Sequence, residues 1–147
     1  MAKAQSQNSV IYSRLLIGKA RHLLLRARQK ELSPFQISPR QANVLAIIYQ
    51  LGEDANLAHL AECSNRNTNT LSIQMKRMGA DGLVTKVRTN PKSNQLRFEL
   101  TAKGLDAYKN GQKMKSVKEI MTVLTEAERQ QLITLLEKVI KKAEKYQ

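Results

Sequence analysis

One short segment of this sequence alternates apolar and polar residues, within a chain whose other apolar residues recur at helical spacing. Three apolar residues alternate with three polar ones, namely Leu96, Phe98 and Leu100 with Gln95, Arg97 and Glu99, which is the pattern of a half-buried strand. A turn-forming stretch, residues 89–94, separates this strand from another predicted over 83–88. The chain is therefore predicted to be mainly α-helical, with a single small β-hairpin.

Four helices are expected before the hairpin. The first covers residues 9–32, and Ser33-Pro34 ends it. The second starts at Ser38-Pro39, with Ser as cap and Pro in the first helical position, and stops at Gly52. A short third helix follows over 57–63, and a fourth over 67–80 carries an inward stripe of Leu71, Met75 and Met78.

The region after the hairpin is predicted to be helical again. Thr101 can cap a helix that continues to about Leu124. Thr125 and Glu128 have the spacing of a capping box, which opens a final helix. The apolar side of that helix comprises Leu132, Leu135, Leu136, Val139, Ile140 and Ala143.

Helix, short helix, turn, helix and hairpin is the order of a winged helix-turn-helix, and the charge of the chain agrees with it. Twenty-five Lys and Arg against 12 Asp and Glu give a net charge of +13. So basic a chain favours a polyanionic partner, either nucleic acid or an anionic membrane surface. Residues 64–98 contain seven Lys and Arg but one acidic residue, Asp81.

The helix over 67–80, the third of the lobe after the first long helix, is the predicted base-reading element. With its apolar stripe turned inward, its outer face is polar and basic, and a helix of this width fits the DNA major groove. Asn, Ser and Thr bond to base edges, an exposed Ile meets a thymine methyl, and Lys and Arg reach phosphates. The candidate DNA-binding residues here are Arg66, Asn67, Thr68, Asn69, Thr70, Ser72, Ile73, Lys76 and Arg77. The alternative is a solvated polar face that binds no partner. Asn and Thr are weak helix formers, however, so such a face would lower helix stability without a functional gain.

The hairpin is the predicted second DNA-binding element. A basic wing lies along the DNA backbone and places a cation in a narrow minor groove. Its candidate residues are Lys86, Arg88, Lys92, Asn94 and Arg97. A solubilising edge hairpin, which also favours Lys, is the alternative.

An ordered set of short motifs resembles the MarR family of regulators (multiple antibiotic resistance regulators). The set is Ser38-Pro39-Arg40-Gln41, Val44-Leu45, Leu60-Ala61, Thr70-Leu71-Ser72, Arg77-Met78, Gly82-Leu83-Val84, Leu100-Thr101-Ala102-Lys103-Gly104 and Leu124-Thr125-Glu126. The resemblance implies one domain over 1–147, with dimerisation helices over 9–36 and 101–147 and a DNA-binding lobe over 37–100. It also implies a ligand-responsive, homodimeric repressor that binds a pseudo-palindromic operator, with a small amphipathic or aromatic effector.

The sequence departs from that family's pattern in the wing and the reading helix. The family's wing carries an acid, one residue, then an Arg, placed eight and six residues before the Leu of Leu-Thr. Lys92 and Asn94 occupy those positions here, so Lys92 or Arg97 is left as the minor-groove cation. The reading helix often has Arg after Ser/Thr, where this chain has Ile73. These changes bear on the operator sequence.

Other groups of residues have the spacing or chemistry of a metal or redox site. His59, Glu62 and Cys63 have i, i+3, i+4 spacing, which suits an open metal site but is common by chance. A redox role for Cys63 is the alternative to a small core residue. We expect no metal, no cofactor and no catalytic residue, because neither a Gly-rich phosphate loop nor a triad order is present. The protein is therefore expected not to be an enzyme.

The sequence also bears on the location of the protein, on an alternative function and on the position of an effector. One cysteine forms no internal disulfide, and no apolar run is long enough to cross a bilayer, so a cytoplasmic protein without a membrane partner is expected. The rival function is non-specific binding of nucleic acid, as in a nucleoid or double-stranded RNA protein. No ligand-contacting residue is assigned, but an anionic aromatic effector is expected between a terminal helix and the winged lobe, near Arg14, Arg21, His22 and Arg26.

Overall fold

The computed structural model describes residues 2–147 and, from residue 8 onward, their side chains. The helices are α1 (Ala2–Leu32), α2 (Pro39–Leu51), α3 (Leu57–Ser64), α4 (Thr68–Ala80), α5 (Ala102–Gly111), α6 (Lys115–Met121) and α7 (Glu126–Ala143). Strands β1 (Val84–Arg88) and β2 (Leu96–Leu100) form an antiparallel hairpin. Single 3-10 turns follow α1, α2 and α7, at Ser33–Phe35, Gly52–Asp54 and Glu144–Tyr146. The chain forms two compact units, one ending at Lys113 and one from Met114 to Gln147.

The core of the first unit lies among α2, α3, α4 and the base of the hairpin, as the sequence predicts. The stripe Leu71, Met75 and Met78 is buried, as are Leu45 and Leu60 of the preceding helices. Ser38 caps α2 in a full capping box with Gln41, and Pro39 occupies the first turn. These helices therefore begin and end where local sequence signals place them.

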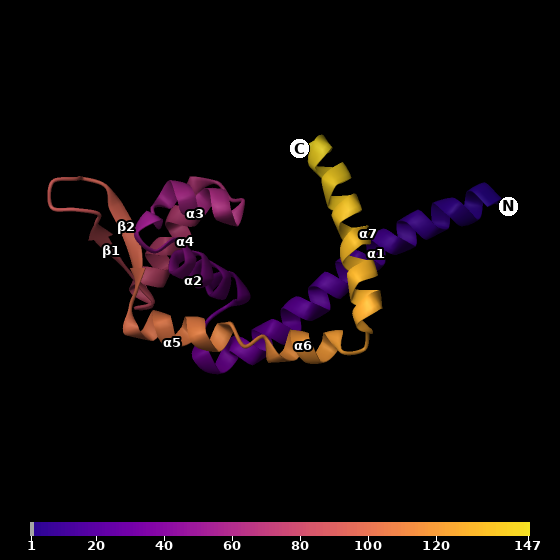
Figure 1. Cartoon of the computed structure of the whole chain (residues 1–147), viewed down its shortest axis with the longest axis horizontal. Helices are drawn as coiled ribbons and strands as arrows, with labels where there is room; N and C mark the ends of the chain where they lie inside the picture. The colour runs from indigo at the N-terminus through magenta and orange to yellow at the C-terminus, as the bar shows by residue number, and fades with distance from the viewer. Residues whose placement is uncertain (1) are drawn as a thin grey trace. The chain divides into compact units, whose positions relative to one another are not determined.

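The hairpin projects from this helical cluster (Figure 1). Its register pairs Val84 with Leu100 and Arg88 with Leu96. Phe98 is buried at the base, where its N–H donates to the Ala55 carbonyl at 2.9 Å. Leu96, predicted to face inward, is instead 45% exposed, because the hairpin extends beyond the lobe at this position.

The junction between hairpin and α5 is closely packed. Thr101 caps α5, as predicted, by accepting from the Gly104 N–H at 3.0 Å. The Thr101 N–H also donates to the Leu83 carbonyl at 3.1 Å. A methyl group on Gly104 would overlap that same carbonyl, so the position requires glycine. The wing base and α5 thus share one anchor on Leu83.

Two predictions about helix boundaries are wrong. The helix expected from Thr101 to Leu124 ends at Gly111, and α6 begins only at Lys115. Gly111 lies against Ala42 and Leu32, and Met114 adopts a left-handed conformation with φ of 46°. Since a residue with positive φ cannot continue a right-handed helix, the helix is interrupted between Gly111 and Lys115. The first helix also begins at Ala2 rather than near Ser9.

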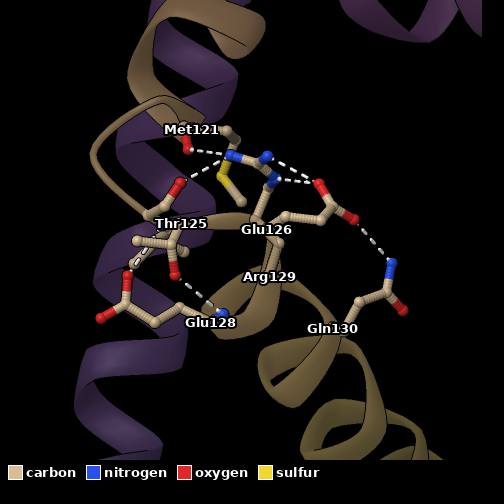
Figure 2. A network of polar contacts seen from close by, with 7 residues as sticks. Met121, Thr125, Glu126, Glu128, Arg129 and Gln130 are labelled. Atoms are coloured by element: carbon tan, nitrogen blue, oxygen red, sulfur yellow. Dashed lines mark hydrogen bonds and ion pairs between the residues drawn. The ribbon is translucent and has the colours of Figure 1, made fainter.

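The second unit contains α6 and α7, joined by a polar cluster (Figure 2). Thr125 and Glu128 form the predicted capping box. Arg129 donates to the Leu124 carbonyl at 2.6 Å and to Glu126 at 2.7 Å, which closes the turn between the helices. No residue of α7 is buried, although its apolar side is large. Within residues 2–147, every helix is too short or too polar to span a lipid bilayer.

Candidate nucleic-acid interface

The start of α4 presents a continuous polar surface. Asn67 is the N-cap residue, and its side chain accepts from the Thr70 N–H at 2.8 Å. Asn67, Thr68, Asn69 and Thr70 are all exposed. Because Leu71 is fully buried one position later, the helix is held with these four residues outward.

The polar surface continues along the outer face of α4. Ile73 is 57% exposed, and Lys76 and Arg77 are exposed one turn further on. Ser72 is half-buried at the margin of this face. A large apolar side chain held in solvent among polar and basic ones suits contact with a base edge bearing a methyl group.

A groove of about 390 Å³ runs between α4 and the start of α2. We call it the α4 groove, and its lining residues are Ser38, Arg40, Gln41, Arg66, Thr70, Ile73, Gln74 and Arg77. Arg66, half-buried, donates to Gln74 at 2.8 Å, which holds its guanidinium beside the helix. Sequence reasoning missed Arg40 and Gln41 as members of this surface. Their position in the first turn of the helix that opens a helix-turn-helix was the available signal.

The hairpin supplies a separate set of exposed cations. Lys86 and Arg88 of β1, and Lys92 and Asn94 of the tip, are exposed. The Lys86 ammonium lies 5.8 Å from the centre of the Phe98 ring, which places it over the base of the wing. The tip is ordered by the Lys92 N–H, which donates to Asn90 at 2.9 Å.

Arg97 differs from the other predicted wing residues. Its side chain is only 17% exposed, and it pairs with Glu99 at 2.6 Å and Glu53 at 3.9 Å. It therefore binds carboxylates of its own lobe and ties β2 to the turn after α2. Of the two candidates for the minor-groove cation, Lys92 is the one at the exposed tip.

A second groove, of about 590 Å³, separates α1 from the start of α2. We call it the α1–α2 groove, and it is lined by Arg21, His22, Leu25, Arg26, Gln29, Ser38, Pro39, Arg40, Asn43 and Arg66. Three of the residues expected beside an effector, Arg21, His22 and Arg26, line it, whereas Arg14 does not. Its lining contains four arginines and no carboxylate.

A third cavity, of about 400 Å³, lies between α2, α5 and the base of the wing. Its apolar walls are Ile48, Phe98, Leu100 and Leu105 together with Tyr49, and the charged residues Glu53, Arg97 and Glu99 also line it. Tyr49 stacks on Tyr108 of α5, with ring centroids 4.3 Å apart. Mostly apolar walls with few polar groups are typical of small-molecule sites.

His59, Glu62 and Cys63, which have the spacing of an open metal site, lie on α3. His59 Nδ1 lies 2.8 Å from the Asp54 carbonyl oxygen and 3.2 Å from Asn56 Nδ2. No group of three or more His, Cys, Asp or Glu suited to holding a metal occurs among residues 2–147. Cys63, expected as a small core residue, is exposed, because it lies on the outer side of α3.

Comparison with known proteins identifies the fold. No family model matches the sequence, and no curated protein matches it either. Among solved structures, E. coli MarR, as a cysteine-to-serine mutant complexed with operator DNA, matches with a TM-score of 0.76 at 24% identity. The match covers 90% of this chain and 96% of that one.

Two further matches belong to the same group. The organohalide-sensing transcriptional regulator RdhR, bound to 2,4-dichlorophenol, has a TM-score of 0.77 at 23% identity, over 90% of this chain and 78% of that one. S. aureus MepR in a DNA complex has a TM-score of 0.74 at 19% identity, over 87% and 94%. At these identities the matches establish the fold, and the chain has the winged-helix fold of MarR-family transcriptional regulators. The resemblance seen in the sequence is thereby confirmed for the fold.

Proposed function

We propose that this protein is a sequence-specific, double-stranded DNA-binding transcription regulator, a ligand-responsive repressor rather than an enzyme. The observation that carries the proposal is the outer face of α4, where exposed Asn, Thr and Ile side chains adjoin exposed cations on a helix whose other face is buried. That combination serves both base reading and phosphate binding. A cytoplasmic location follows from this function.

Two groups of residues divide the work in this proposal. Thr68, Asn69, Thr70, Ser72 and Ile73 read bases in the major groove, and Asn67 orders the start of the helix. Phosphates are bound by the cations of α4, of the turn before it and of the wing, which are Arg66, Lys76, Arg77, Lys86, Arg88 and Lys92. Asn94 lies beside Lys92 at the wing tip, and Arg97 supports the wing from within the lobe.

A homodimer on a pseudo-palindromic operator is part of the proposal. In α7, Leu135, Val139 and Ile140 are each more than half exposed, and α1 exposes Ile11 and Leu15 to a similar degree. Such apolar faces are larger than a soluble monomer ordinarily leaves in water. A two-fold partner would cover them, with 9–36 and 101–147 as the dimerisation segments and 37–100 as the DNA-binding lobe.

A small amphipathic or aromatic effector completes the proposal. The solved structures that share this fold include RdhR bound to 2,4-dichlorophenol and CouR, a transcriptional repressor, bound to p-coumaroyl-CoA. In this chain the cavity at the wing base offers apolar side chains and the ring of Tyr49, which stacks on Tyr108, beside the ion pair of Arg97 and Glu99. A ligand there would act on DNA binding through the position of the wing.

Footprinting on the DNA that flanks the protein's own gene tests the function. We expect a protected pseudo-palindrome that survives an excess of random duplex. Asn69→Ala should weaken operator binding by about 1–3 kcal/mol and leave random DNA almost unaffected. Lys86→Ala, the matched control, should weaken both DNAs alike.

Two results would contradict this assignment. Equal affinity of the wild type for all duplexes would favour the rival, non-specific binding of nucleic acid. Identical behaviour of the Asn69 and Lys86 variants on both DNAs would remove the reading role of α4.

A further inference from the structure

The α1–α2 groove is a strongly cationic concave surface, with four arginines among its lining residues. Arg21 and Arg26 come from α1, Arg40 from α2 and Arg66 from the turn before α4, and no acid is among the lining residues. Its floor is formed by the first turn of α2, beginning at the cap Ser38. A cluster of like charges held together without counter-charges is costly unless a polyanion neutralises it.

The groove is continuous with the surface assigned to DNA. Ser38, Arg40 and Arg66 line both the α1–α2 groove and the α4 groove. Cations therefore follow one another from Arg77 of α4, through Arg66 and Arg40, to Arg26 and Arg21 of α1. A DNA backbone presents phosphates at regular intervals along such a path.

The lining favours a DNA backbone over a small effector as the occupant. Small-molecule sites enclose most of their ligand with apolar and aromatic walls. Here Arg21, His22, Leu25 and Arg26 are all exposed, and Leu25 is the large apolar side chain among the lining residues. Exposed arginines around an open groove suit a strand of phosphates that stays partly in water.

We propose that the α1–α2 groove binds the phosphate backbone of the duplex that α4 reads, with Arg40 at the edge of the α4 groove and Arg21 and Arg26 of α1 as phosphate ligands beyond it. The inference rests on the proposed function and adds α1 to the DNA interface. The first helix then has two roles, with dimerisation assigned to its apolar residues and DNA binding to its last three turns.

The test uses the full chain with Arg21→Ala, Arg26→Ala and the double variant. Arg14→Ala is the matched control, because it removes the same charge from an exposed position of α1 that does not line the groove. Operator affinity is measured across a series of salt concentrations, and phosphate ethylation interference maps the contacted phosphates. Sedimentation and circular dichroism verify that every variant keeps the mass and helicity of the wild type.

Each groove variant should lower the slope of log affinity against log salt by about one unit for every phosphate that it no longer neutralises, or about two in a dimer. The ratio of operator to random-DNA affinity should stay unchanged, because phosphates carry no sequence information. Interference should disappear at the same phosphates in both groove variants and persist in Arg14→Ala.

Specific outcomes would overturn the inference. A double variant with the wild-type slope and interference pattern shows that the groove does not bind the backbone. An equal decrease of slope in Arg14→Ala shows an effect of overall charge. Either result leaves the proposed function standing, whereas a wild type without preference for any operator contradicts the function itself.

Discussion

Leucine side chains on the apolar faces of α4 and α7 differ in their exposure to solvent. Leu71 of α4 is fully buried, whereas Leu135 of α7 is 53% exposed. Both belong to amphipathic helices with a good N-terminal cap, Asn67 in one and Thr125 in the other. The inward stripe of α4 is therefore covered within one chain, and the apolar side of α7 is not. The difference teaches that helical periodicity identifies an apolar face but not whether its partner lies in the same chain.

The two helices also differ in what holds them in place. The position of α4 is set by burial of Leu71, Met75 and Met78, which leaves its outer face free for recognition. The start of α7 is held by polar contacts instead, through the capping box and Arg129 (Figure 2). Mutations in the buried face of α4 should therefore affect the free energy of unfolding, whereas mutations in the exposed apolar face of α7 should affect association.

The largest effect is expected in the core of the winged lobe. Leu71→Ala should lower the free energy of unfolding by about 2–5 kcal/mol, because it removes a fully buried side chain and leaves a cavity. Ile73→Ala, two residues along the same helix but 57% exposed, should change it by less than about 0.5 kcal/mol. Urea unfolding measures both, and equal losses would contradict the assignment of the two faces of α4.

A smaller effect is expected on association through α7. Leu135→Ala should weaken dimerisation by about 1–2 kcal/mol, the order expected for the loss of a partly covered leucine. Sedimentation equilibrium should show the wild type at twice the chain mass of 16.6 kDa and the variant dissociating at higher concentration. Glu137→Ala, exposed on the same helix, is the control. A wild-type monomer at micromolar concentration would remove the intermolecular explanation of this face.

Most of the fold follows from local signals in the sequence. The caps Ser38, Asn67, Thr101 and Thr125 lie at the starts of helices, and the stripe of α4 is buried as its spacing indicates. The hairpin strands also form where alternation and turn residues place them. These features depend on residues close in sequence, so a sequence pattern can report them.

Contacts between residues distant in sequence could not be predicted in this way. The break after Gly111 depends on its packing against Ala42 and Leu32, which the helical pattern of 101–124 does not show. The pairing of Arg97 with Glu53, forty-four residues earlier, is another contact that the charge and position of Arg97 in the wing do not reveal. Arg40 and Arg66, twenty-six residues apart, line the same groove, and that proximity also appears only in the fold.

The cap of α7 should have a moderate effect on stability. Thr125 accepts from the Glu128 N–H at 3.2 Å, and Glu128 accepts from the Thr125 N–H at 2.8 Å. Thr125→Ala removes the first bond and should cost about 1 kcal/mol, while Thr125→Ser keeps it and should cost less. Thermal unfolding followed at a helical wavelength measures the difference. Equal midpoints for the two variants would show that the capping hydroxyl does not stabilise α7.

The smallest effect concerns Glu126, which is fully exposed. Hydrogen bonds from Gln130 and Arg129, together with the charge of Arg129, lower the pKa of Glu126 below its ordinary value. A carboxyl whose pKa is lower in the folded state stabilises the fold above its unfolded pKa, and this stabilisation is lost as the pH falls through the folded pKa. Glu126→Gln should therefore be slightly less stable than the wild type at neutral pH, and the two should converge in acid. Solvent and salt screen the exposed charge, so the gap should also narrow at high ionic strength. Melting temperatures measured across pH test this prediction. Glu137→Gln is the control, because it makes the same change of charge elsewhere on α7. If the difference in melting temperature between the wild type and Glu126→Gln stays constant from neutral pH into acid, the carboxylate of Glu126 does not stabilise the turn.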